Sequence, residues 1–244
     1  DFDTYDVSTA SFVDSFSVAS QDDNPTGLAF SADGTKMFVT GRTNDKVFQY
    51  ALSTAFDVST SSYTQDFSVS SQASQPAGIA FNNDGTKMFV VDFNDDDVNE
   101  YALTTGFDIS TASYTQNFSV ASQETVPHDI AFNNDGTKMF ICGNGGVEVN
   151  EYALTTGFDI STASFTTNFS VSAQEANPRG LAFNSDGTKM FVCGTTGQDV
   201  NEYALTTGFD ISTASYTQNF SVSAQDDTPK SVKFNTDGTK MFIL

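Results

Sequence analysis

The hexapeptide Asp-Gly-Thr-Lys-Met-Phe occurs five times in this chain, and each copy begins 51 residues after the previous one. No insertion or deletion interrupts this period, and all five prolines and all five methionines fall at one repeat position each. A fixed period of roughly this length is typical of solenoids, propellers and other arrays in which neighbouring repeats bury a shared core. The period is therefore the strongest constraint on the fold. The copies begin at Asp33, Asp84, Asp135, Asp186 and Asp237.

One repeat has the pattern of four short antiparallel strands. In the second repeat, "GIAFN" follows Pro76, "NDGT" is a hairpin turn, and "KMFVV" has the continuous apolar character of a strand covered on both faces. The segments "VNEYAL" and "SYTQNFSV" complete the set, and no helical periodicity is present. Four strands repeated around an axis form the blades of a propeller. The sequence therefore predicts an all-β fold, a β-propeller of five 51-residue four-stranded repeats.

The ends of the chain predict an incomplete last blade. Five full repeats would need 11 more residues, and the missing piece contains the third strand. Either the N-terminal strand closes the fifth blade with a defect, or the natural polypeptide continues beyond Leu244, which we favour. We expect a gap, a shifted pairing of residues 11–18 or a strand from another chain at this seam, with Lys233 in a wet site. The predicted single domain, 1–244, comprises an N-terminal strand over 1–18, blades over 26–69, 77–120, 128–171 and 179–222, and a partial blade over 230–244.

Composition excludes several classes of protein. The formal net charge of −21 argues against nucleic acid and anionic membranes as partners. A content of 38% hydrophobic residues with 24 phenylalanines excludes an acidic disordered tail, and no apolar run approaches the roughly 20 residues of a membrane span. Cys142 and Cys193 occupy one repeat position in neighbouring repeats. We expect them to be free and buried, because neighbouring sheets pack about 10 Å apart.

The stretch P-x-G-[IL]-A-F-N-x-D-G-T-K-M-F-V resembles the inner hairpin of NHL and YVTN/lactonase-like β-propellers. The longer pattern "DGTKMFVVG…DVNEYALTTGFDISTASYTQNFSVS" is similar to repeats in predicted surface and virion proteins of marine phages and bacteria. Near-identical repeats also resemble five-bladed lectins. These resemblances cover nearly the whole chain and imply the propeller fold, but propellers host many unrelated functions.

Two segments differ strongly between repeats, whereas the turns scarcely change. One is the loop between blades that contains the repeated proline, and the other joins the second and third strands. Strand direction places both variable segments on one face of the disc and the Asp-Gly turns on the opposite face. Loops on a rigid scaffold often carry binding residues. This face is therefore the predicted binding side, although neutral variation of solvated loops would give the same pattern.

The residue after each repeated proline should lie at the mouth of the central channel. In the last three repeats this residue is His128, Arg179 or Lys230, which gives a cationic arc on an acidic protein. With Asp129, Arg42 and Lys46, these residues form the predicted ligand-binding set, for a carboxylate or sulfate of a glycan. The alternative is that long polar side chains simply line a wet funnel.

The loop "DFNDDD" has the density of oxygen ligands that suits Ca²⁺. Its candidate ligands are Asp92, Asn94, Asp95, Asp96 and Asp97. The bidentate glutamate of an EF-hand is missing, because the twelfth position is Leu103. A solvated acidic loop is the simpler interpretation, so we expect no cofactor, with calcium as the alternative.

No catalytic triad or metal triad stands out, and near-identical repeats offer little asymmetry for an active site. The sequence therefore favours a non-enzymatic, lectin-like recognition module, extracellular or virion-associated, that binds a surface glycan or protein. The alternatives are a structural or decoration domain, with other chains of a larger assembly as partners, and a lactonase-like propeller enzyme.

Overall fold

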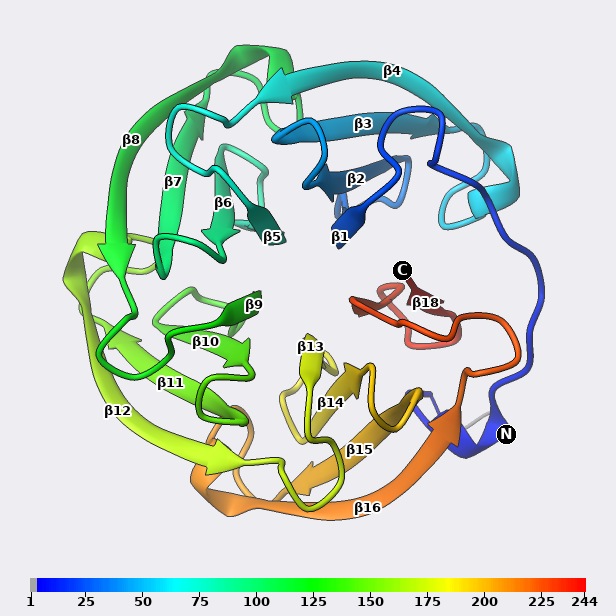
Figure 1. Cartoon of the computed structure of the whole chain (residues 1–244), viewed down its shortest axis with the longest axis vertical. Helices are drawn as coiled ribbons and strands as arrows, with labels where there is room; N and C mark the ends of the chain where they lie inside the picture. Colours follow the sequence, from blue (N-terminus) through cyan, green and yellow to red (C-terminus); the bar gives the residue numbers. More distant parts are fainter. Residues whose placement is uncertain (1–3) are drawn as a thin grey trace.

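The computed structural model describes residues 4–244 as a ring of five blades around a central axis (Figure 1). Four blades are four-stranded antiparallel sheets and the fifth has two strands, so the predicted fold class is confirmed. The first two blades contain β1 (Pro25–Phe30), β2 (Lys36–Gly41), β3 (Lys46–Leu52), β4 (Ser61–Ser68), β5 (Pro76–Phe81), β6 (Lys87–Asp92), β7 (Asp97–Leu103) and β8 (Ala112–Ser119). The others contain β9 (Pro127–Phe132), β10 (Lys138–Gly143), β11 (Glu148–Leu154), β12 (Ala163–Ser170), β13 (Pro178–Phe183), β14 (Lys189–Gly194), β15 (Asp199–Leu205), β16 (Ala214–Ser221), β17 (Val232–Phe234) and β18 (Met241–Ile243).

The glycine of the Asp-Gly turn is required because its backbone has a positive φ and because an aromatic ring lies against it. Gly136 has φ +70°, and a Cβ there would lie 2.2 Å from the ring of Phe158. Asp135 accepts a hydrogen bond from the backbone N–H of Thr137 at 3.0 Å, which fixes the turn. The pairing of Pro127 with Gly143, and of Phe132 with Met139, places the turn at the opposite end of the blade from the proline. The two predicted faces of the disc are therefore present.

Short 3-10 helices precede the outermost strands of the four complete blades, and a fifth precedes residues 11–18. Each has an aspartate at its N-cap whose carboxylate accepts the N–H two residues later, as in Asp159 and Ser161 at 3.1 Å. Among residues 4–244, no helix is long and apolar enough to cross a membrane. The helices are η1 (Val7–Thr9), η2 (Val58–Thr60), η3 (Ile109–Thr111), η4 (Ile160–Thr162) and η5 (Ile211–Thr213).

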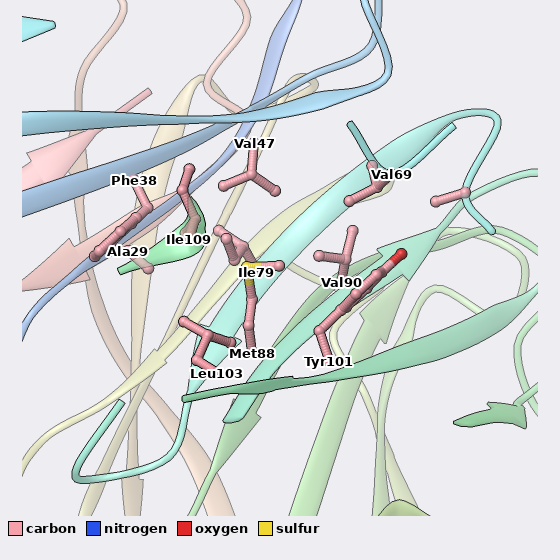
Figure 2. Close-up of a cluster of buried hydrophobic side chains, with 11 residues drawn as sticks. Ala29, Phe38, Val47, Val69, Ile79, Met88, Val90, Tyr101, Leu103 and Ile109 are labelled. Carbon is pink, nitrogen blue, oxygen red and sulfur yellow. The ribbon is translucent and has the colours of Figure 1, made fainter. Parts of the chain in front are cut away.

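The hydrophobic core lies between adjacent blades. In the cluster shown in Figure 2, Phe38 and Val47 of the first blade pack with Met88, Val90 and Tyr101 of the second. The tyrosine of each complete third strand is fully buried, and the four are Tyr50, Tyr101, Tyr152 and Tyr203. Burial of the alternate faces of each sheet against its neighbours explains the continuous apolar runs in the second strands.

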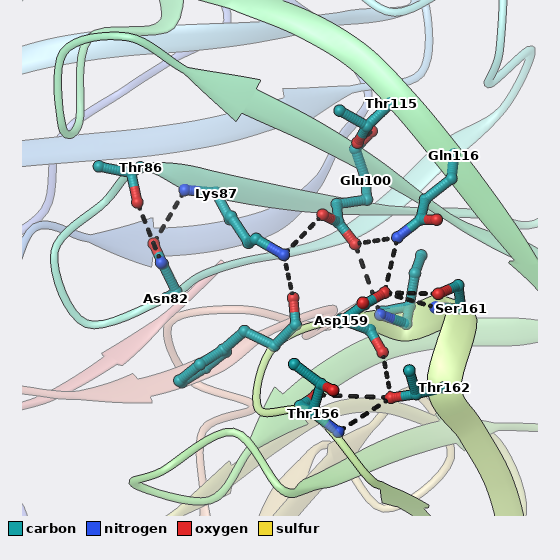
Figure 3. Close-up of polar contacts among 12 residues, drawn as sticks. Asn82, Thr86, Lys87, Glu100, Thr115, Gln116, Thr156, Asp159, Ser161 and Thr162 are labelled. Carbon is teal, nitrogen blue, oxygen red and sulfur yellow. Dashed lines mark hydrogen bonds and ion pairs between the residues drawn. The ribbon is translucent and has the colours of Figure 1, made fainter.

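A lysine contact connects each blade to the next. Lys87 donates to the backbone oxygen of Phe158 at 2.6 Å and pairs with Glu100 at 2.8 Å (Figure 3). Lys189 donates in the same way to the oxygen of Tyr5 at 2.9 Å, and Lys240 to that of Phe56 at 2.8 Å. The N-terminal segment therefore takes the place of the closing part of the fifth blade.

The seam contains the expected gap. Residues 11–18 form no β-strand, although the equivalent residues of the other blades form β4, β8, β12 and β16. Figure 1 shows this N-terminal segment following the rim of the ring, separated from β18. The third strand that would lie between them is missing, so backbone hydrogen bonds cannot form there.

Candidate functional site

A pocket of about 360 Å³ lies at the mouth of the central channel, on the face of the variable loops. All five residues that follow the repeated prolines line this pocket, which brings distant parts of the sequence into one ring. Arg42, which follows β2, also reaches the pocket, whereas Lys46 does not line it. The lining residues are Asn24, Thr26, Arg42, Ala77, His128, Arg179, Thr195, Thr228 and Lys230.

The pocket collects positive charge without compensating carboxylates. Arg42, Arg179 and Lys230 form no ion pair among the described residues, and no aspartate or glutamate lines the pocket. Burial lowers the pKa of each of the three groups, and their mutual repulsion lowers the pKa of Lys230 and Arg42 further. The Nε atoms of both arginines are buried and lack hydrogen-bond partners. Such an arrangement favours an anion in the pocket.

His128 is a buried neutral imidazole among these cations. Its side chain is 4% exposed, and Nε2 lies 2.8 Å from the guanidinium Nη1 of Arg179. Burial, followed by the charges of Arg179 and Arg42, lowers the pKa of His128 to about 3. Because the guanidinium can only donate, the imidazole accepts this hydrogen bond and is unprotonated at neutral pH.

Phe93 organises one side of the pocket from outside its lining. Its ring stacks on that of His128, with centroids 5.2 Å apart, and the guanidinium of Arg42 lies 4.5 Å from the centre of the Phe93 ring. Phe93 is not among the predicted site residues and was expected only as part of an acidic loop. Its departure from the glycine-rich or polar loops of the other repeats is the signal that could have revealed it.

A buried ion pair connects the inner strands of the third and fifth blades past that of the fourth, where Lys233 also donates to the oxygen of Leu181 at 2.9 Å. Lys233 of β17 contacts Asp129 of β9 at 2.9 Å, and their side chains are 16% and 1% exposed. Asp129 also accepts the backbone N–H groups of Leu181 and Ile130, both at 2.9 Å. The ammonium of Lys233 is thus compensated by a carboxylate while its side chain stays partly exposed, and the wet site expected for it stays a prediction. Both residues replace small residues of the other repeats, and these two opposite changes could have indicated the pair.

The acidic residues of the variable loops mainly bind backbone. Glu124 accepts N–H groups of Val126 and Gly145 at 2.8 and 2.7 Å. In the second blade Ala73 occupies the position of Glu124, and Asp92 makes the equivalent connection from the opposite loop, to the N–H groups of Ser74 and Gln75 at 3.1 and 3.2 Å. In both blades a carboxylate of one variable loop accepts N–H groups of the other variable loop. The carboxylate comes from the loop before the proline in the third blade and from the loop after the second strand in the second blade.

The predicted calcium ligands are therefore already engaged in part. Asp97 accepts the side-chain amides of Asn99 and Asn117 at 2.7 and 2.6 Å, and Asn94 donates its backbone N–H to Asp92 at 2.9 Å. Asp95 and Asp96 lie in the adjoining turn. Within residues 4–244, no group of three or more His, Cys, Asp or Glu side chains is arranged to hold a metal. Calcium binding stays a prediction.

A family model described as "Lactonase, 7-bladed beta-propeller" matches residues 3–238. No curated protein matches the sequence. Among solved structures, the chain is similar to a protein from Bacteroides fragilis, provisionally named a 6-phosphogluconolactonase, with 14% identity and a TM-score of 0.56 over 90% of this chain and 57% of the other. A protein of the same provisional name from Bacteroides uniformis gives 12% identity and a TM-score of 0.55, with coverage of 90% and 57%. The chain thus spans less than two thirds of these structures.

The family match corrects two expectations. A non-catalytic module was predicted, together with lectin-like, phage and virion associations, whereas the matching family is one of lactonases. Near-identical repeats were expected to leave no asymmetric site. The repeats instead differ at the residue after the proline, and the ring brings these five residues, Thr26, Ala77, His128, Arg179 and Lys230, together with Arg42 in one pocket.

Proposed function

The chain belongs to the lactonase family of seven-bladed β-propellers, and on that premise we propose that its channel-mouth pocket hydrolyses an anionic sugar lactone. The Bacteroides structures provisionally named 6-phosphogluconolactonases suggest a phosphorylated sugar lactone as the substrate class. The observation that carries the proposal is a neutral histidine beside three unpaired cations in one pocket.

The pocket has the charge that an anionic substrate requires. The protein carries a formal net charge of −21, so most of its surface repels anions. Arg42, Arg179 and Lys230 provide a local exception, and Lys230 is directed by hydrogen bonds to Asn24 and the oxygen of Pro25 at 2.7 and 3.1 Å. A phosphate or carboxylate would accept hydrogen bonds from the two guanidinium groups, including their unpartnered Nε atoms.

His128 would act as the general base. When the bound anion draws the guanidinium of Arg179 away, Nε2 of His128 is free to take a proton from water. The resulting hydroxide adds to the lactone carbonyl carbon. The tetrahedral oxyanion is stabilised by the neighbouring guanidinium of Arg179. When the intermediate collapses, the ring C–O bond breaks and the alkoxide receives the proton held by His128. One water is consumed, and the product is the open-chain hydroxy acid.

Substrate charge would make this base more effective. In the free protein the pKa of His128 is about 3, because burial and two guanidinium charges disfavour the imidazolium. An anion bound between Arg42 and Arg179 offsets those charges and moves the pKa towards its ordinary value of about 6.5. The base therefore strengthens when an anionic substrate is present, which favours phosphorylated over neutral lactones.

The experiment compares hydrolysis of gluconolactone with that of its 6-phosphate, after subtraction of the rate in buffer. We expect His128→Asn to lower kcat by about 10²–10⁴-fold, and Arg179→Met to lower kcat/KM by about 10²–10³-fold. Lys46→Met is the matched control, because it also removes one positive charge but lies outside the pocket, paired with Asp66 at 3.0 Å. Hydrolysis no faster than in buffer, or equal activity of the His128→Asn variant, would refute the proposal.

A further inference from the structure

A second and larger cavity, of about 850 Å³, lies at the seam between the fifth and first blades. One wall is β18 with the residues around it, and the other is the N-terminal segment 10–18. The outer edge of β18 has no partner strand in the described chain, because β18 pairs only with β17. An unpaired edge beside an apolar cavity is a site where a strand can be added.

We propose that this seam groove is an acceptor for one β-strand with the chemistry of the repeat's own third strand, Asp-Val-Asn-Glu-Tyr-Ala-Leu. The four complete blades show what fills the equivalent space. In each of them the third strand pairs with the second and the fourth, as β15 does with β14 and β16. The occupant is therefore defined by four internal copies of the same structure.

Two aromatic residues at the groove lack the tyrosine that their counterparts contact. Tyr101 of the second blade packs against Phe67 and Tyr114, with ring centroids 5.7 and 5.8 Å apart. At the seam, Phe220 is the counterpart of Phe67 and Phe12 that of Tyr114, and both line the cavity. Phe12 is 60% exposed, whereas Tyr114 is 42% exposed. A tyrosine placed between Phe12 and Phe220 would restore both contacts.

At the groove, the second strand of the fifth blade is less buried than its counterpart in the fourth blade. Its residues 241–244 are all half-buried, whereas Met190, Phe191, Val192 and Cys193 at the same positions of the fourth blade are 0% exposed. A valine and a leucine of the added strand would cover this surface. Such burial provides the main driving force for strand addition at an apolar edge.

A charge at the groove also matches the proposed strand. Lys87, Lys138 and Lys189 each pair with the glutamate of the adjoining third strand, at 2.8, 2.8 and 3.1 Å. Lys240 lines the groove and forms no such pair among the described residues. The glutamate of the added strand would meet Lys240, which fixes the direction and register of binding.

A second copy of this chain is a poorer occupant. Its third strands, β3, β7, β11 and β15, are each paired on both sides within complete blades. Donation of one of them would require that blade to open. The groove is therefore better suited to a free strand than to another folded copy.

The test uses a peptide copy of residues 195–207, with one tryptophan added outside the strand. The chain has no tryptophan, so the peptide's own fluorescence reports binding without background. We expect saturable binding to the full chain, and at least a tenfold loss when Tyr203→Ser or Glu202→Lys is made in the peptide. In the protein, Phe12→Ser should weaken binding similarly. Tyr63→Ser, at the same position of the complete first blade, should not.

Fusion of residues 194–207 after Leu244 provides a second measurement. We expect the fused strand to raise Tm by on the order of 5–10 °C, and the same fusion with Tyr203→Ser in the added copy to lose most of that rise. Equal binding of the wild-type and serine peptides, no binding with no rise in Tm, or a dimer that the peptide does not dissociate would each overturn the proposal.

Discussion

The ion pair between Asp129 and Lys233 can be removed in a way that the chain itself suggests. The other repeats have glycine or serine in place of Asp129 and alanine in place of Lys233. Lys233→Ala alone leaves a carboxylate that is 1% exposed without its cation, and Asp129→Gly alone leaves the lysine unpaired. Loss of one partner of a buried pair costs about 3–5 kcal/mol.

The double variant should behave differently. Replacing both partners by the small residues of the other repeats removes the desolvation cost of both charges, and such replacements are often neutral or stabilising by about 1–4 kcal/mol. Since 1 kcal/mol shifts Tm by roughly 2–4 °C in a chain of this size, each single variant should melt on the order of 10 °C lower. The double variant should melt near or above the parent.

Urea denaturation of the four proteins measures the coupling free energy directly. Acidity provides a further check, because burial raises the pKa of Asp129 and loss of Lys233 raises it more. The folded Lys233→Ala variant then binds more protons than its unfolded chain, so its stability should fall as pH rises and recover on acidification. Additive effects of the two substitutions, or a double variant as unstable as the singles, would refute this reasoning.

Three other substitutions or treatments test single features. Gly136→Ala should lower the free energy of unfolding by about 1–3 kcal/mol, because φ is +70° and the new Cβ would lie 2.2 Å from the ring of Phe158; an unchanged urea midpoint would contradict this. His128 has a folded pKa of about 3, so stability should fall as pH decreases below 6.5, by about 2 kcal/mol between pH 6.5 and 5; a parent and a His128→Gln variant with the same pH slope would show otherwise. Cys142 and Cys193 are buried and the pKa of each thiol is raised, so a thiol reagent should label them only after unfolding; rapid labelling of the native chain would be the opposite result.

Most of the fold could be predicted because the chain contains five comparable copies of one repeat. Alternation, the Asp-Gly turn and the position of proline each recur with the same spacing, so local preferences agree across the chain. The same comparison indicated that His128, Arg179 and Lys230 meet at the channel mouth. The period does not, however, show which of the residues that differ between repeats contact each other. Asp129 and Lys233 lie in different blades and meet only across the closed ring.

The protonation states in the pocket were harder to predict from the sequence than the position of the pocket. The sequence gives His128 no partner, and its low pKa depends on burial and on two arginines from other parts of the chain. Phe93 contributes by stacking on His128 and by contacting Arg42, neither of which has a sequence pattern. Electrostatic shifts arise from three-dimensional proximity, so the residues could be identified in advance but their protonation could not.

The lysine contact between blades has an evolutionary consequence. The contact between blades always runs from a lysine to a backbone oxygen of the following blade, whether from Lys87 to Phe158 or, across the ends of the chain, from Lys189 to Tyr5. A contact rule of this kind refers to a neighbour and not to the size of the ring. Because the repeat length never varies, duplication or deletion of one whole repeat would leave every remaining contact of this type unchanged. Blade number could thus change in a single genetic event, with the packing angle between sheets alone left to adjust.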